Sequence, residues 1–296
     1  MNLFITIVIL VLIGYLLDRE IYFYEGVHLG PRVQAWLYDR WSRKYDEGKH
    51  ESQLRDDAML ARPLLDLLNA SRVPEPFILD FATGTGRLSF ALLNQADFKG
   101  HIIALDLSQG MLEQAAVKFG LDTASGVEWT QSVSRPPTPT RPPENVELLR
   151  HQSMPLPFPD AAFDAVCCLE VLELFSAMDE PLAELTRVLR PGGILLTSRG
   201  TEESGRKAKV KSKADFASLL EGNGLKDIQI TTWWKLFDRA LAVKNGTSEA
   251  VHARKLSEMI RCSACGQVQW ESEASALKCR NCGRELSITK EGIVLN

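Results

Sequence analysis

Basic residues are not in excess in this sequence. Lys and Arg number 34 against 38 Asp and Glu among 296 residues, a net charge of −4. Such a chain has no overall positive field, so any attraction to nucleic acid has to be local. Cysteine is also scarce, at six residues, which excludes a disulfide scaffold for a chain of this length. The remaining composition, 45% hydrophobic and 24% charged, is that of a globular protein with about two domains.

Charged side chains are absent from residues 1–17, which read MNLFITIVILVLIGYLL. No positive segment precedes this run and no small-residue cleavage site follows it, which argues against a signal peptide. A helix that is apolar on every face rarely finds cover in a core. Residues 1–24 therefore predict a membrane anchor. Because the neighbouring basic residues follow the run, we expect a single-pass membrane protein whose catalytic domain faces the cytoplasm.

Strands and helices alternate over residues 31–250. The run 77–79 is strand-like, a glycine-rich turn follows, and residues 88–93 have helical character. The same alternation continues to residue 243, which predicts an α/β fold: a doubly wound, mostly parallel, seven-stranded sheet of the Rossmann-like type. Five prolines within residues 136–143 predict that residues 122–146 form a Pro-rich insertion at the surface.

The turn after the first strand has the features of a nucleotide cradle. Gly84 and Gly86 allow a backbone path close to a ligand, and Asp106 ends the second strand, where a carboxylate accepts hydrogen bonds from ribose hydroxyls. The glycine spacing does not match the NAD fingerprint, and no Gly-Lys-Ser/Thr follows, which excludes a P-loop. The sequence therefore predicts a nucleoside-containing cofactor.

The motifs resemble those of the class I S-adenosylmethionine-dependent methyltransferases, within their type 11 group. The segments that carry this resemblance are ILDFATGTGRLSFALL, ALDLSQGMLEQA, RHQSMPLPFPDAAFDAV and PLAELTRVLRPGGILLTSRG. Ala82 stands where the family usually has glycine, and Gln152 where it has an Asp for the adenine amino group. The segment YDRWSRKYD is similar to the helix that covers the methionine end of the cofactor.

The resemblance implies S-adenosylmethionine as the cofactor and ten positions that bind it. They are Tyr45, Asp80, Ala82, Gly84, Gly86, Asp106, Leu107, Met111, Gln152 and Glu170. The sulfonium methyl is already activated, so the main task of the protein is alignment. A general base is needed only if the acceptor loses a proton. Glu170, Glu173 and His151 are candidates for that role. For each of them the structural interpretation is stronger: a solvated carboxylate at a helix start, or an ordinary surface histidine.

Four of the cysteines fall in two CxxC pairs near the end of the sequence. Cys262, Cys265, Cys279 and Cys282 supply the four thiolates of a tetrahedral, structural Zn²⁺ site. Residues 255–296 therefore predict a zinc ribbon. This segment also resembles the ribbons found in or beside some RNA and protein methyltransferases.

Three functions fit these features. The first is a membrane-tethered methyltransferase with a small, lipid-soluble or membrane-proximal acceptor, such as a quinone or lipid precursor. The second is a methyltransferase of ribosomal or transfer RNA, suggested by the ribbon and by the basic residues of segment 206–213. The third is a non-catalytic scaffold that binds the cofactor, suggested by Ala82 and Gln152.

Overall fold

An eight-stranded sheet is the centre of the fold in the computed structural model, which describes residues 3–121, 144–152, 154–175, 177–204 and 210–296. The strand order is β11-β3-β2-β1-β4-β5-β7-β6. β7 is antiparallel to its neighbours, whereas the other neighbouring pairs are parallel. The predicted Rossmann-like sheet is therefore confirmed, with one strand more than predicted. Most of the predicted Pro-rich insertion lies outside the described residues.

The bounds of the elements follow the predicted alternation. The strands of the large sheet are β1 (Phe77–Phe81), β2 (His101–Asp106), β3 (Val146–Arg150), β4 (Phe163–Cys168), β5 (Leu189–Gly200), β6 (Leu225–Trp234), β7 (Phe237–Lys244) and β11 (Ile293–Leu295). The helices are α1 (Leu3–Asp18), α2 (Pro31–Tyr45), α3 (His50–Gln53), α4 (Arg62–Ala70), α5 (Arg87–Leu93), α6 (Gln109–Phe119), α7 (Asp179–Val188) and α8 (Lys213–Gly222). A smaller antiparallel sheet contains β8 (Trp270–Ser272), β9 (Ala276–Cys279) and β10 (Glu285–Ser287).

Two buried clusters form the core, one on each face of the sheet. Side chains of α4, α5 and α6 pack against one face. The opposite face is covered by α7, α8 and the C-terminal segment. β1 and β4 are buried along their whole lengths, as expected for parallel strands covered on both sides.

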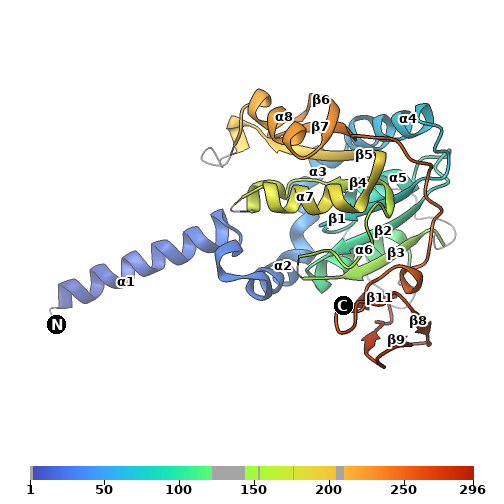
Figure 1. The fold of residues 1–296 in the computed structure, drawn as a ribbon. Coiled ribbons are helices and arrows are strands. Elements are labelled where there is room, and N and C mark those ends of the chain that lie inside the picture. The colour runs from blue at the N-terminus through green and yellow to red at the C-terminus, as the bar shows by residue number, and fades with distance from the viewer. Residues whose placement is uncertain (1–2, 122–143, 153, 176, 205–209) are drawn as a thin grey trace.

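The eighth strand comes from the C-terminal segment, which the sequence predicted as a zinc ribbon. β11 pairs in parallel with β3, so residues 293–295 extend the large sheet. In Figure 1 the red C-terminal segment lies beside β3 at the lower edge of the domain. This explains why the periodicity of residues 31–250 predicted only seven strands.

The prediction of a membrane anchor over residues 1–24 is wrong. No helix in the described part of the chain is long and apolar enough to cross a membrane. α1 has 16 residues, about 24 Å at 1.5 Å per residue, whereas the hydrocarbon core is about 30 Å thick. A short π-helical turn, Arg19–Phe23, follows it and carries charged side chains. The same finding contradicts the predicted single-pass membrane localisation. α1 projects from the body (Figure 1) with most of its apolar side chains exposed.

Candidate cofactor and metal sites

The turn between β1 and α5 is held by its own side chains. Asp80 is buried, and its Oδ2 accepts hydrogen bonds from Thr83 Oγ1 and Ser89 Oγ, each at 2.6 Å. Burial raises the pKa of Asp80, and these two hydroxyls partly offset that effect. The contacts described for Asp80 therefore fix the shape of the turn.

The two glycines of this turn have different functions. Both have left-handed backbone angles, with φ of +57° at Gly84 and +74° at Gly86. A Cβ at Gly86 would lie 2.4 Å from Phe119 Cζ, so that glycine permits close packing of the turn on α6. A Cβ at Gly84 would meet nothing within 4 Å. Gly84 therefore borders open space and forms the part of the turn that a ligand reaches.

Asp106 connects this turn to the end of β2. Its Oδ2 accepts from the N–H of Gly84 and its Oδ1 from the N–H of Ser108, each at 2.8 Å. Burial raises the pKa of Asp106 to about 6, although the backbone amides favour the charged form. A carboxylate has about four lone-pair sites, so these amides do not use all of them.

α2 closes over this edge through a residue that the sequence did not single out. Asp39 Oδ1 accepts from Ser108 Oγ at 2.6 Å and from the N–H of Gly110 at 2.8 Å. These contacts tie α2 to the first turn of α6. A short acidic side chain within a helix gives no sequence signal for such a distant contact.

A second carboxylate lies at the other end of the cleft, after β4. Glu170 is paired with Lys49 and, at 3.0 Å, with Arg87 Nη1. Its φ of +60° is in the left-handed region, and its N–H donates to Ser198 Oγ at 2.7 Å. The strained backbone therefore has a partner that holds it.

Arg87 extends these contacts into an ionic network. It pairs with Asp56 through two nitrogens, and its guanidinium carbon lies 4.5 Å from the ring centroid of Trp233. Burial raises the pKa of Asp56 to about 6, and the hydrogen bond from Arg87 opposes this rise. Lys49, Asp56 and Trp233 were not predicted, because they come from segments far from the glycine-rich turn.

The cleft brings together five of the ten predicted cofactor-binding residues. It is lined by Tyr45, Asp80, Ala82, Gly84 and Glu170, together with Lys49 and Arg87. Asp106 joins this group through its bond to Gly84. Gly86 is buried against α6.

The three other predicted residues lie along β2, α6 and the end of β3. Met111 is buried in α6, and Gln152 Nε2 donates to the carbonyl of Leu107 at 3.3 Å. None of the three lines the cleft. The arrangement thus has a buried carboxylate, Asp106, at one end and an ion-paired carboxylate, Glu170, at the other. The individual contacts with the cofactor remain predictions.

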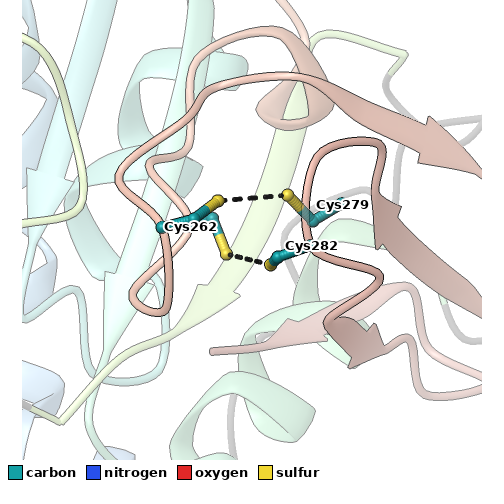
Figure 2. Close-up of side chains that lie close together, drawn as sticks. Cys262, Cys279 and Cys282 are labelled. Carbon is teal, nitrogen blue, oxygen red and sulfur yellow. Dashed lines mark hydrogen bonds between the residues drawn. The ribbon is translucent and has the colours of Figure 1, made fainter.

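The four C-terminal cysteines come together as a metal site. Their sulfur atoms all lie within 4.8 Å of one another, and two facing pairs, Cys262–Cys282 and Cys265–Cys279, are each 3.6 Å apart (Figure 2). A disulfide has sulfurs about 2.05 Å apart, whereas a tetrahedral site with Zn–S bonds of about 2.3 Å has them about 3.8 Å apart. The spacing therefore fits four thiolates around one ion.

The two halves of this site have the same local geometry. The N–H of Gly266 donates to the carbonyl of Cys262 at 2.7 Å, and that of Gly283 to the carbonyl of Cys279 at 2.9 Å. Both glycines have φ of +74°, which favours glycine after each CxxC pair.

Comparisons with known proteins agree with this site. Residues 79–197 match the family described as "Methyltransferase domain". A demethylmenaquinone methyltransferase of Lactobacillus johnsonii is 29% identical over 62% of this chain and 65% of its own length. A ubiquinone/menaquinone biosynthesis C-methyltransferase of Brucella anthropi is 29% identical over 55% of this chain and 52% of its own. In both, the match covers less than two thirds of the relative.

The fold has a counterpart among solved structures. A structure from Methanococcus maripaludis, assigned as an S-adenosylmethionine-dependent methyltransferase, aligns with a TM-score of 0.50 and 17% identity. The alignment covers 71% of this chain and 94% of that one. Family and fold together support S-adenosylmethionine as the cofactor. Residues 79–197 of this chain therefore match a methyltransferase domain, on the same fold as the structure from Methanococcus maripaludis.

Proposed function

We propose that the chain transfers the methyl group of S-adenosylmethionine to a ring carbon of a quinone-type acceptor. The observation that carries the methyl-transfer part is the cradle in which Gly84 borders open space and donates its N–H to Asp106. The quinone part is supported by the named activities of the relatives from Lactobacillus johnsonii and Brucella anthropi.

S-adenosylmethionine, when bound, supplies a methyl group on a sulfonium, which is already a good leaving group. Asp106 is placed to accept hydrogen bonds from the ribose hydroxyls, and Gly84 allows the ligand to lie against the backbone. Carbon methylation of a reduced quinone forms a ring C–CH₃ bond, and the ring then loses its proton to regain aromaticity. The chain has to hold the ring in line with the methyl and sulfur atoms.

Glu170 is a predicted candidate for accepting that proton. Its two oxygens are already paired with Lys49 and Arg87, so the protein itself occupies the carboxylate. We therefore assign Glu170 to holding Lys49 and the segment after α2 over the cleft. This leaves the ring proton to be lost to solvent or to the acceptor's own oxygen.

An apolar acceptor has a second cleft available at the same edge of the sheet. A cavity of about 730 Å³ lies between the beginning of α7 and the beginning of α8, where the chain follows β4 and β5. Phe175, Met178, Val210 and Leu219 line it. The other half of the lining is polar, with Asp179, Lys211, Ser212, Asp215 and Ser218, so the cavity suits an acceptor that carries polar groups beside its apolar part.

We further propose that the cysteine site holds Zn²⁺ in a structural role. Four thiolates close the coordination shell and leave no open position for a substrate. Purified protein should contain about one zinc per chain by elemental analysis. A protein that is folded, reduced and free of metal would contradict this assignment.

A partitioned labelling assay tests the function. Purified protein receives methyl-labelled S-adenosylmethionine with a reduced demethylated naphthoquinone, a total lipid extract or total RNA, and Asp106→Ala serves as the matched control. We expect label in the quinone and in the lipid extract, and none with the control. Label confined to RNA would overturn the quinone proposal and favour the RNA hypothesis. Failure to bind S-adenosylhomocysteine by calorimetry would overturn methyl transfer altogether.

A further inference from the structure

The connection between β3 and β4 supplies no helix to the part of the sheet face that lies beside β3. Parallel strands are usually joined by a crossover that contains a helix, but no helix lies among the described residues of segment 151–162. The C-terminal segment covers this region instead. Leu149 of β3 belongs to the same buried cluster as Met259, Trp270 and Leu277. The cysteine module, residues 256–296, therefore supplies a layer of the methyltransferase core.

The same module also supplies the edge strand. Ile293, Val294 and Leu295 of β11 pair with Leu148, Leu149 and Arg150 of β3. Ile293 is buried in the cluster on one face of the sheet, and Val294 in the cluster on the other. β11 is thus anchored on both faces, although it has only three residues.

Hydrogen bonds continue from β11 to the ribose end of the cofactor site. The N–H of Asn296 donates to the carbonyl of Arg150 at 3.0 Å, and its side-chain Nδ2 lies 3.1 Å from Nδ1 of His151. The N–H of His151 donates at 2.9 Å to the carbonyl of Asp106. Two contacts therefore separate the side chain of Asn296 from the backbone of Asp106.

The cysteine site lies where it can hold this arrangement together. Cys262 and Cys279 are buried in the cluster that contains Leu149 and Val294. The strands β8, β9 and β10 have only three or four residues each. A segment of about 40 residues with so little sheet usually needs a metal or disulfides to fold. Loss of the metal is therefore expected to release β11 from β3.

We propose that the cysteine module is a positioning element of the cofactor site: with its metal bound, it docks β11 on β3 and, through Asn296 and His151, fixes Asp106 for ribose binding. The inference rests on the proposed cofactor and zinc sites. It makes the four cysteines and Asn296 positioning residues, which affect the binding of the cofactor without touching it.

Three variants of the full chain test this proposal. Deletion of residues 293–296 removes β11 and keeps the cysteines, Asn296→Ala removes one side-chain contact, and Cys282→Ser opens the metal site at its exposed ligand. Lys290→Ala, an exposed residue of the turn before β11, is the matched control. Each protein is measured for zinc content, melting temperature, Kd for S-adenosylhomocysteine, KM for S-adenosylmethionine and kcat.

We expect the deletion to retain zinc and to raise Kd and KM about tenfold, with kcat within about twofold of the wild type. Asn296→Ala should raise both about threefold, the loss of one hydrogen bond, without a change in melting temperature. Cys282→Ser, or wild type treated with a chelator, should lose zinc and show the same rise in Kd as the deletion. Lys290→Ala should match the wild type.

The outcomes separate this inference from the functions on which it rests. A deletion variant or a zinc-free protein with wild-type Kd would overturn the inference alone. If the deletion variant does not fold, Asn296→Ala decides, and an unchanged KM there overturns the proposal. Wild type that does not bind S-adenosylhomocysteine, or that contains no metal, refutes the proposed cofactor site or zinc site instead.

Discussion

The two carboxylates at the ends of the cofactor cleft are held by opposite means. Asp106 is buried and accepts from two backbone amides, those of Gly84 and Ser108. Glu170 is paired with two cationic side chains, Lys49 and Arg87, from distant segments. The first contact set is nearly local and uses the backbone. The second uses long side chains that must all be ordered together.

This difference predicts that Asp106 contributes mainly to ligand affinity and that the network around Glu170 contributes mainly to stability. The Asp106 cradle keeps lone pairs for a ligand, so its removal should chiefly reduce affinity. The ionic network around Glu170 has its charges matched within the protein, with Asp56 and Arg87 mostly buried. Removing one member leaves buried charge without a partner, which chiefly reduces the free energy of unfolding.

Arg87→Met should produce the largest effect on stability. The substitution leaves Asp56 without its guanidinium and Glu170 with Lys49 alone. We expect the free energy of unfolding to fall by about 3 kcal/mol, as for breaking a buried ion pair, measured by urea denaturation. Arg62→Met is the control, because Arg62 pairs with Asp66 and Asp97 at the surface, where the loss of an ion pair has little effect on stability. Equal losses in the two variants would contradict the comparison.

Asp106→Ala should produce the largest effect on affinity. It removes an acceptor of two ribose hydrogen bonds, which predicts a rise in Kd for S-adenosylhomocysteine of about 100-fold, at about 1.5 kcal/mol for each charged hydrogen bond. Glu170→Gln should raise the same Kd less than about tenfold, because its partners are protein side chains. Calorimetry on both variants measures the contrast. A larger rise in Glu170→Gln would reverse the roles assigned to the two carboxylates.

The sequence predicted the cradle because its members are near one another in the chain or at the ends of adjacent strands. Gly84, Gly86 and Asp106 follow from one turn and one strand end. The network was not predicted beyond Glu170. Lys49 and Asp56 lie in the short helical turns between α2 and α4, whose approach to β4 is set by tertiary packing. No spacing in the sequence encodes that approach.

At both ends of the chain, the sequence pattern predicted local features but not how the segment is arranged in the fold. Uniform apolarity predicted that α1 crosses a membrane, but the helix ends after 16 residues. The spacing of the C-terminal cysteines correctly predicted that four thiols come together. It did not reveal that β11 pairs with β3, because a three-residue strand has too little pattern to choose a partner.

Lowering the pH should weaken the ligand binding that depends on Asp106. Burial raises the pKa of Asp106 to about 6, and the ribose hydroxyls need an ionised acceptor. Below that pKa most of the Asp106 carboxyl is protonated and has to lose its proton before the ligand binds. Kd for S-adenosylhomocysteine should therefore rise about tenfold between pH 7.5 and pH 5. Asp56 has a similar pKa, also about 6, so Asp106→Asn is the control and should flatten the profile. A profile that is unchanged in Asp106→Asn would assign the titration to Asp56.

The smallest expected effect compares the same substitution at the two strained positions. Ala82 and Glu170 both have left-handed backbones, with φ of +53° and +60°. Glycine relieves this strain, which is about 1 kcal/mol or more. It also raises the conformational entropy of the unfolded chain, which costs up to about 1 kcal/mol of stability. Ala82→Gly should therefore gain about 0.5 kcal/mol in the free energy of unfolding. Glu170→Gly has the same relief but loses both ion pairs, so it should be less stable than the wild type. If both variants gained stability, the ionic network would contribute less than the backbone strain it accompanies.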